Sequence, residues 1–213
     1  MLSPLILGIR SLLFPASCAG CRLPLAEEGS YPLCPACVKE LPWSSPVSFN
    51  QAISPFHYEG VAKELIAQLK YQSRLSLVPF LGQILTETVL RRLGPDPADA
   101  VVPVPLHPVR LRERTFNQAQ FLAQRLADNL RLPCRRNLLI RRKATHPQAD
   151  LSRGERRANV EGAFALAPDP LIRSARLLLV DDVFTTGSTA NACAKILKQA
   201  GAAQVTVVAL AHG

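Results

Sequence analysis

The chain has 213 residues, a length that suits one domain of ordinary size with a small appendage. Apolar residues make up 48% and charged residues 19%, so the chain can bury a core and global disorder is excluded. The formal net charge is +9, and the whole excess lies in residues 110–157, which hold 13 basic and 4 acidic side chains. Such a segment favours anionic partners, either phosphates or nucleic acid.

The first segment, residues 1–16, is apolar but is interrupted by Pro4, Gly8, Arg10 and Pro15. We expect a short amphipathic helix that packs on the protein, with a signal peptide or membrane anchor as the alternative. No stretch reaches the roughly 20 apolar residues that a membrane helix needs. The sequence therefore predicts a cytoplasmic protein without a membrane span.

Four of the six cysteines form two CxxC pairs that are separated by twelve residues, namely Cys18, Cys21, Cys34 and Cys37. Two such pairs on short turns can bring four thiolates to the corners of a tetrahedron around Zn²⁺. Four protein ligands leave no open position, so we expect a structural rather than a catalytic zinc ion. Disulfides and a redox function are the alternatives, and the missing export signal disfavours disulfides.

Beyond the cysteines, and after a segment rich in proline and serine at 41–55, apolar strands alternate with helices. Helices are predicted at 61–71, 75–93, 116–130 and 188–200, and strands at 56–58, 100–104, 162–166, 175–180 and 204–211. Residues 131–160 are expected to be basic and irregular. Strands that are apolar on both faces and alternate with helices predict an α/β fold with a parallel sheet between helices.

The most informative pattern follows the strand at 175–180. Two carboxylates, Asp181 and Asp182, precede a loop of hydroxyl-bearing residues and one glycine, and a helix then begins; the loop consists of Thr185, Thr186, Gly187, Ser188 and Thr189. Successive backbone N–H groups, hydroxyls and a helix N-terminus can bind a monophosphate. Carboxylates repel phosphate but bind sugar hydroxyls, so the pattern predicts a ribose 5-phosphate site. An Asp pair with Ser188 as an ordinary helix cap is the simpler alternative.

This strand, Asp-Asp pair and TTGST loop resemble the phosphoribosyl pyrophosphate (PRPP) signature of type I phosphoribosyltransferases. Within that superfamily the chain resembles the ComF/GntX family. The resemblance extends to the cysteine module and to three further segments: LIAQLKY at 65–71, VVPVPLHPVRLRERTFNQA at 101–119, and residues 145–164. It implies a type I phosphoribosyltransferase-like parallel sheet with flanking helices. It also implies two parts, an N-terminal helix with a zinc ribbon at 1–54 and the phosphoribosyltransferase-like domain at 55–213.

The resemblance also implies roles for individual residues. Asp181 and Asp182 would be the catalytic pair that holds the ribose diol, and the TTGST loop would bind the 5-phosphate. Pyrophosphate, together with Mg²⁺, would lie against Arg110, Arg114, Asn117 and Gln118. The basic residues at 141–157 correspond to a flexible hood that closes over the reaction centre. The chain departs from the family pattern at Thr115, where the family usually has glycine.

Two functions follow from the resemblance. The first is PRPP binding with phosphoribosyl transfer, in a protein of natural competence that handles incoming single-stranded DNA together with other competence proteins. The alternative is a non-catalytic nucleic-acid-binding module that uses the phosphoribosyltransferase fold and takes PRPP as a regulatory ligand. The basic segment at 110–157 is compatible with both functions.

Overall fold

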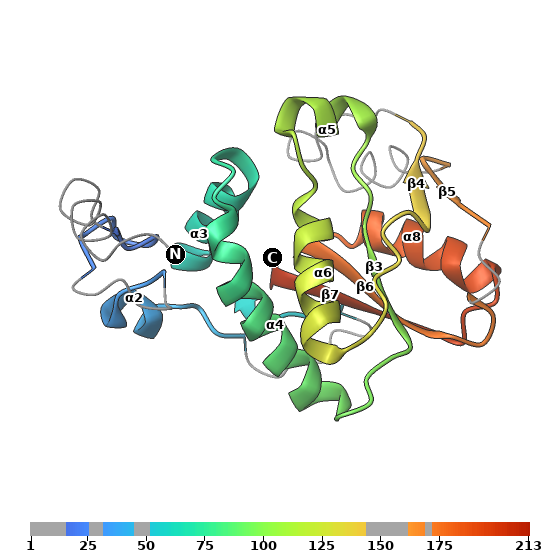
Figure 1. The fold of residues 1–213 in the computed structure, drawn as a ribbon, viewed down its shortest axis with the longest axis horizontal. Coiled ribbons are helices and arrows are strands. Elements are labelled where there is room, and N and C mark those ends of the chain that lie inside the picture. The colour runs from blue at the N-terminus through green and yellow to red at the C-terminus, as the bar shows by residue number, and fades with distance from the viewer. Residues whose placement is uncertain (1–15, 26–31, 45–51, 144–161, 169–171) are drawn as a thin grey trace, which may run out of the picture.

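A computed structural model gives the structure of the protein (Figure 1). It describes residues 16–25, 32–44, 52–143, 162–168 and 172–213. The helix expected at 1–16 lies outside these residues except for Ala16, and so does most of the expected hood, from residue 144 to residue 161. Within the described ranges, no helix is both long enough and apolar enough to cross a membrane.

The centre of the protein is a five-stranded sheet in which every pair of neighbouring strands is parallel. Its main path runs β1 (Ala52–Ile53), β7 (Gln204–His212), β6 (Arg176–Phe184) and β3 (Ala100–Pro103), and β2 (Phe56–His57) also pairs with β7. This sheet confirms the predicted parallel α/β architecture. β1 pairs with β7 although it precedes the domain boundary expected after residue 54.

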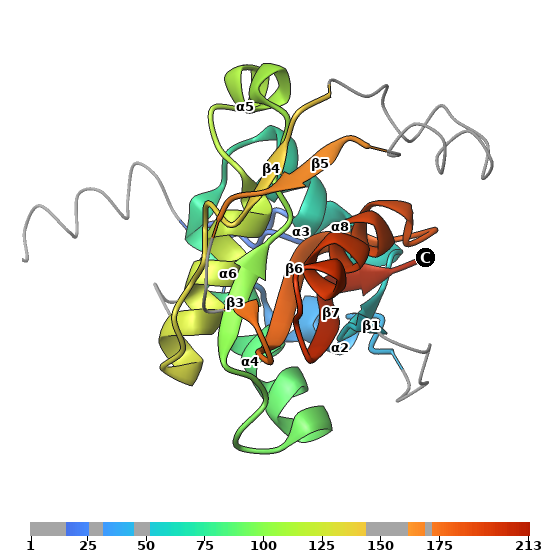
Figure 2. The same ribbon diagram turned by 90° about the vertical axis from the view of Figure 1, so that its right-hand side faces the viewer.

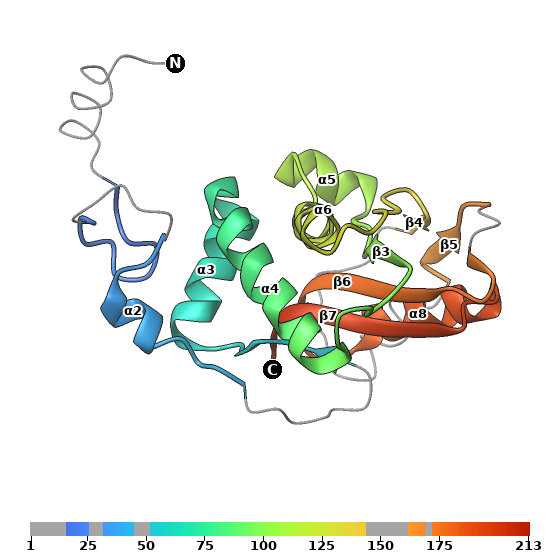
Figure 3. The same cartoon turned by 60° about the horizontal axis from the view of Figure 1, so that its bottom comes forward.

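Helices cover both faces of the sheet, as Figure 3 shows. On one face lie α3 (Gly60–Tyr71), the short helix η1 (Leu75–Leu77), α4 (Val78–Leu93) and α6 (Gln118–Leu130); on the other lies α8 (Ser188–Gln199). Alternate residues of β6 serve the two faces: Leu178 packs in the cluster with α3, α4 and α6, and Leu177 and Leu179 pack in the cluster with α8. This period of two is that of a strand buried on both sides.

The cysteine module lies beyond α3, on the side away from the sheet (Figure 1). Its described residues include the short helix α2 (Pro35–Lys39). Its buried residues Ala19, Leu33 and Leu41 belong to the same hydrophobic cluster as Leu65 and Leu69 of α3. The module therefore shares a continuous core with the sheet domain.

The structure corrects the expected elements in three places. β6 does not end at Val180 but continues through both aspartates to Phe184, because β7 still pairs with it there. The segment expected to be irregular contains β4 (Leu139–Arg141), which pairs antiparallel with β5 (Phe164–Leu166), apart from the main sheet (Figure 2). Between the strand expected at 100–104 and the helix expected at 116–130, where no element was predicted, the structure has the helix α5 (Pro108–Arg114).

Thr115 occupies the position where α5 ends, and its backbone is left-handed, with φ +65°. A β-branched residue is strained in this region, whereas glycine is not. The backbone thus explains why glycine suits this position, and it shows that this chain holds a threonine there at a conformational cost.

We predict that Thr115→Gly raises the free energy of unfolding by about 1 kcal/mol, the penalty of a Cβ in the left-handed region. Urea denaturation at equilibrium measures the change. Thr115→Ala is the control, since it keeps the Cβ and should gain less than the glycine variant. A glycine variant less stable than the wild-type protein would contradict the assignment of strain to this backbone.

Candidate functional site

A cavity of about 400 Å³ lies at the carboxyl ends of β3 and β6, where open α/β sheets bind their ligands. Nine of the predicted site residues line it: Arg110, Asn117, Gln118, Asp181, Asp182, Thr185, Gly187, Ser188 and Thr189. Thr186 is not in the lining, and the side chain of Arg114 lies outside the described part of the structure. Segments that are distant in the sequence therefore meet around one space.

The loop after β6 has the geometry of an anion site. Gly187, with φ +71°, is the residue that caps α8, and it has no side chain with which to occupy the free N–H groups of the first turn. A Cβ at this position would lie 2.7 Å from Cζ of Phe184, so only glycine fits. The hydroxyls of Thr186 and Ser188 lie 2.9 Å apart in the same turn. Gly187 rather than Ser188 is the N-cap. The N–H of Ser188 makes only a long contact of 3.5 Å with Oγ1 of Thr186, so an anion could still bind at this helix N-terminus.

The two carboxylates at the end of β6 have different partners. Asp182 Oδ1 lies 2.9 Å from Nζ of Lys70, and both side chains are about 15% exposed. Asp181 Oδ1 accepts a hydrogen bond of 2.9 Å from the backbone N–H of Asp182. Burial and, after it, the negative charge of Asp182 raise the pKa of Asp181 to about 7. Asp181 therefore holds a proton more readily than a free aspartate does, next to the ion pair of Asp182 with Lys70.

Lys70 is a site residue that the sequence analysis missed. Burial lowers its pKa, but the neighbouring carboxylates, first Asp182 and then Asp181, outweigh burial and raise it. Lys70 also lines the cavity. A signal was present in the sequence, because Lys70 follows Ile66 by four residues and so continues the apolar stripe of α3, where a lysine needs a partner.

Two arginines reach the cavity from different elements, Arg110 from α5 and Arg141 from β4. The guanidinium of Arg141 lies over the ring of Phe164, 5.3 Å from its centroid, and burial lowers the pKa of this arginine. Arg141 had been assigned only to the basic hood. The structure gives it a fixed place in the cavity wall.

The two amides that precede and begin α6 have different surroundings. Asn117 caps the helix: its Oδ1 accepts from the N–H of Ala119, and its Nδ2 donates 3.0 Å to the carbonyl of Val104. Gln118 is 1% exposed, and its Nε2 has no hydrogen-bond partner in the described structure. A buried N–H donor without a partner is costly, so this one is suited to an oxygen of a ligand in the cavity.

The four cysteines of the N-terminal module come together as predicted, with all four Sγ atoms within 4.8 Å of one another. Sγ of Cys21 and Sγ of Cys34 are 3.8 Å apart, the separation of about 3.8 Å that tetrahedral Zn–S bonds of 2.3 Å require. Burial raises the pKa of the Cys18 thiol, but N–H groups of Cys34 and Gly20 point at its sulfur and help to lower that pKa to about 6. The donor set fits a structural Zn²⁺ ion.

Comparison with known proteins identifies the family. No family model matches the chain. Competence protein F of Haemophilus influenzae is 32% identical over 208 residues, which cover 92% of this chain and 90% of the relative. DNA utilization protein YhgH of Salmonella typhimurium is 35% identical and covers 89% of this chain and 81% of the relative. The chain belongs to the family of competence protein F.

Among solved structures, the chain is similar to a purine phosphoribosyltransferase from Pyrococcus horikoshii. The identity is 18% and the TM-score 0.41, over 63% of this chain and 72% of the other.

The cysteine cluster leads to a prediction about the metal content of the protein. The wild-type protein should contain one zinc ion per chain, and Cys37→Ser should abolish that zinc, because three thiolates and a hydroxyl bind Zn²⁺ far more weakly than four thiolates. Atomic emission measures the metal content. Cys193→Ser is the control; Cys193 is a buried residue of α8, in the hydrophobic cluster on the other face of the sheet, so this variant should keep its zinc. A zinc-free wild-type protein with two disulfides would contradict the assignment.

The raised pKa of Asp181 leads to a prediction about how stability depends on pH. An aspartate has a pKa near 3.9 in the unfolded chain, so between pH 4 and 7 the folded protein holds a proton that the unfolded chain has lost. Stability therefore falls as the pH rises through this window. The side chain of Asp181→Asn does not titrate. The free energy of unfolding of this variant minus that of the wild-type protein should therefore increase by on the order of 2 kcal/mol between pH 4.5 and pH 8.

Urea denaturation at a series of pH values measures this difference. Asp99→Asn is the control, because hydrogen bonds from Arg176 lower the pKa of Asp99 and its effect should be constant between pH 5 and 8. A difference between Asp181→Asn and wild type that does not change from pH 4.5 to 8 would show that Asp181 titrates normally.

Proposed function

We propose that the cavity binds PRPP together with Mg²⁺, and that the protein uses this site in natural competence, in the handling of incoming single-stranded DNA in the cytoplasm. The observation that carries the proposal is the meeting of three kinds of group around one cavity: a helix N-terminus, a half-buried carboxylate pair and arginines. A ribose that bears phosphate at one end and pyrophosphate at the other matches these groups.

Each part of the ligand has a group to bind it. The 5-phosphate would lie in the turn Thr185–Thr189 at the start of α8, where backbone N–H groups and hydroxyls converge. Asp181 and Asp182 would accept hydrogen bonds from the ribose hydroxyls. The pyrophosphate would contact Arg110 and the unpartnered Nε2 of Gln118. We also assign Arg114 to the pyrophosphate, and Asn117 holds the helix that presents Gln118.

If the bound PRPP reacts, a nucleophile attacks C1′ and pyrophosphate leaves. Mg²⁺ would offset charge on the pyrophosphate when bound. Asp181 and Asp182 would stabilise the positive charge that develops on the ribose ring, and Arg110 the charge of the leaving group. Lys70 already neutralises part of the aspartate charge, so the pair can stay buried without a ligand.

Calorimetry with PRPP and Mg²⁺ tests the proposal. We expect binding to the wild-type protein, and we expect Gly187→Ala to weaken it at least tenfold, because the new Cβ meets the Phe184 ring and strains a backbone with φ +71°. Gly94→Ala is the control, since it also replaces a glycine of positive φ but lies at the far end of α4. No binding of PRPP to the wild-type protein would refute the proposal.

A second candidate is the non-catalytic module that binds single-stranded nucleic acid. The names of the relatives support it, since they concern competence and DNA utilization. So do the exposed cations Arg112, Arg136, Arg142 and Lys143. Other competence proteins would then be partners of the chain.

Salt-titrated binding of a fluorescent single strand tests this function. We expect the logarithm of affinity to fall by about 0.7 per logarithmic unit of salt for each phosphate contacted. Arg136→Ala with Arg142→Ala should flatten that slope, whereas Arg92→Ala, on α4, should not. Absence of binding at low salt would refute DNA contact, and pyrophosphate release on adding the strand to PRPP would favour transfer over passive binding.

A further inference from the structure

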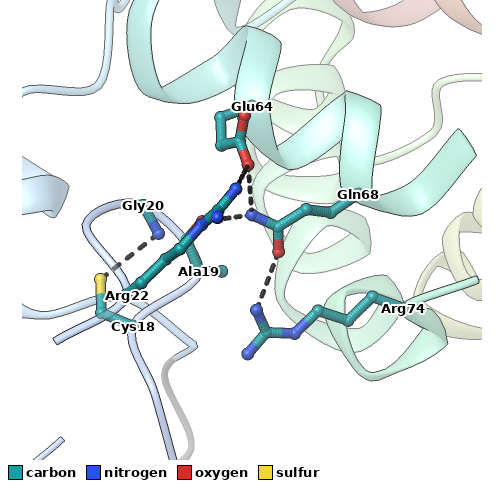
Figure 4. Close-up of polar contacts among 7 residues, drawn as sticks. All are labelled: Cys18, Ala19, Gly20, Arg22, Glu64, Gln68 and Arg74. Carbon is teal, nitrogen blue, oxygen red and sulfur yellow. Dashed lines mark hydrogen bonds and ion pairs between the residues drawn. The ribbon is translucent and has the colours of Figure 1, made fainter. Parts of the chain in front are cut away.

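The helix α3 separates the cysteine module from the ligand cavity and contacts both. Glu64 and Gln68 are four residues apart and so lie on one face, which meets the first cysteine knuckle, residues 16–25 (Figure 4). Lys70 follows Gln68 by two residues, a turn of about 200°, and so points the opposite way, into the cavity. One helical turn therefore carries a contact with the knuckle and a contact with the carboxylate pair.

Gln68 is the centre of the contact with the knuckle. It is 2% exposed, and its Nε2 donates 2.6 Å to the carbonyl of Ala19 and 2.9 Å to Oε1 of Glu64. Its Oε1 accepts a hydrogen bond of 2.8 Å from Nη1 of Arg74. The same arginine donates 3.0 Å from Nη2 to the carbonyl of Ser17. Ser17 and Ala19 flank Cys18, so these bonds join the metal-binding knuckle to the end of α3.

These polar contacts hold the C-terminal end of α3, whereas the apolar core holds its middle. The core holds the body of α3 through Leu65 and Leu69. Beyond Tyr71 the helix ends, and Ser73 is left-handed with φ +53°. Arg74 donates to Gln68 in the last turn twice: once from its side chain and once from its N–H, which is 3.4 Å from the carbonyl of Gln68. The turn that carries Lys70 is thus closed by bonds to the knuckle.

We propose that Gln68 and Arg74 are positioning residues: they hold the last turn of α3 against the cysteine knuckle and so place Lys70 on Asp182. The cysteine module then serves the ligand cavity through α3 as well as stabilising its own fold. The effect on ligand affinity rests on the proposed PRPP site, whereas the effect on the helix itself does not.

The test uses full-length, zinc-loaded protein and the variant Gln68→Leu, which keeps the size of the side chain and removes its hydrogen bonds. We expect zinc content to stay at the wild-type value and amide hydrogen exchange to rise at least tenfold in residues 69–75, with no rise in α4. Binding of PRPP with Mg²⁺ should weaken about tenfold. Arg74→Leu should act in the same way.

The matched control is Arg22→Ala. Arg22 also joins the knuckle to α3, but its side chain is 75% exposed and its contact with Glu64 is 3.4 Å long, so its loss should change neither exchange nor affinity. A double-mutant cycle of Gln68→Leu with Lys70→Met separates positioning from general loosening. If Gln68 acts through Lys70, the two losses of affinity should be far from additive.

Unchanged exchange in residues 69–75 of Gln68→Leu would overturn the proposal, and so would additive losses in the cycle. If the wild-type protein does not bind PRPP, the proposed function fails, and hydrogen exchange alone decides whether the knuckle holds the end of α3.

Discussion

A pair of adjacent carboxylates lies half-buried at the end of β6, and the rest of the site depends on how their charge is offset. Two ionised aspartates in contact and out of water would be costly. The structure lowers that cost in two ways: Lys70 lies 2.9 Å from Asp182, and the pKa of Asp181 is raised so that this group holds a proton more readily. The carboxylates can therefore remain in a cavity whose wall also contains Arg110 and Arg141.

The cation that neutralises the pair comes from α3, and this links the two parts of the chain. α3 packs its apolar face into the core and its polar face on the first cysteine knuckle. A module this small depends on the hydrophobic cluster that it shares with α3, and its four cysteines lie close enough together to hold a metal ion. The same contacts fix the end of α3, so the cysteine module and the cavity depend on one helix.

The structure divides the excess basic residues of the chain between the cavity and the exposed surface. Arg110 and Arg141 line the cavity, from α5 and β4 respectively. Arg136, Arg142 and Lys143 are exposed to solvent close in sequence to β4. The basic segment therefore contributes both to the cavity wall and to the exposed surface of the protein.

The sequence by itself determined the parallel sheet, the cysteine cluster and the position of the TTGST turn. These depend on local signals: apolar runs, CxxC spacing, and a glycine with hydroxyls before a helix. The prediction that Cys18 to Cys37 converge was confirmed because short turns leave the four thiols few other arrangements. The likeness to the family of competence protein F was confirmed because it involves several separate motifs.

Only the tertiary structure decided which distant groups share the cavity. Lys70, Arg141 and the unpartnered amide of Gln118 belong to three elements that meet through packing, and no local pattern specifies that meeting. The length of β6 was set by its partner β7, and β4 pairs with β5 although the two strands are far apart in the sequence, a pairing that sequence periodicity does not predict. Local chemistry is thus readable in the sequence, whereas neutralisation of the aspartate pair depends on long-range packing.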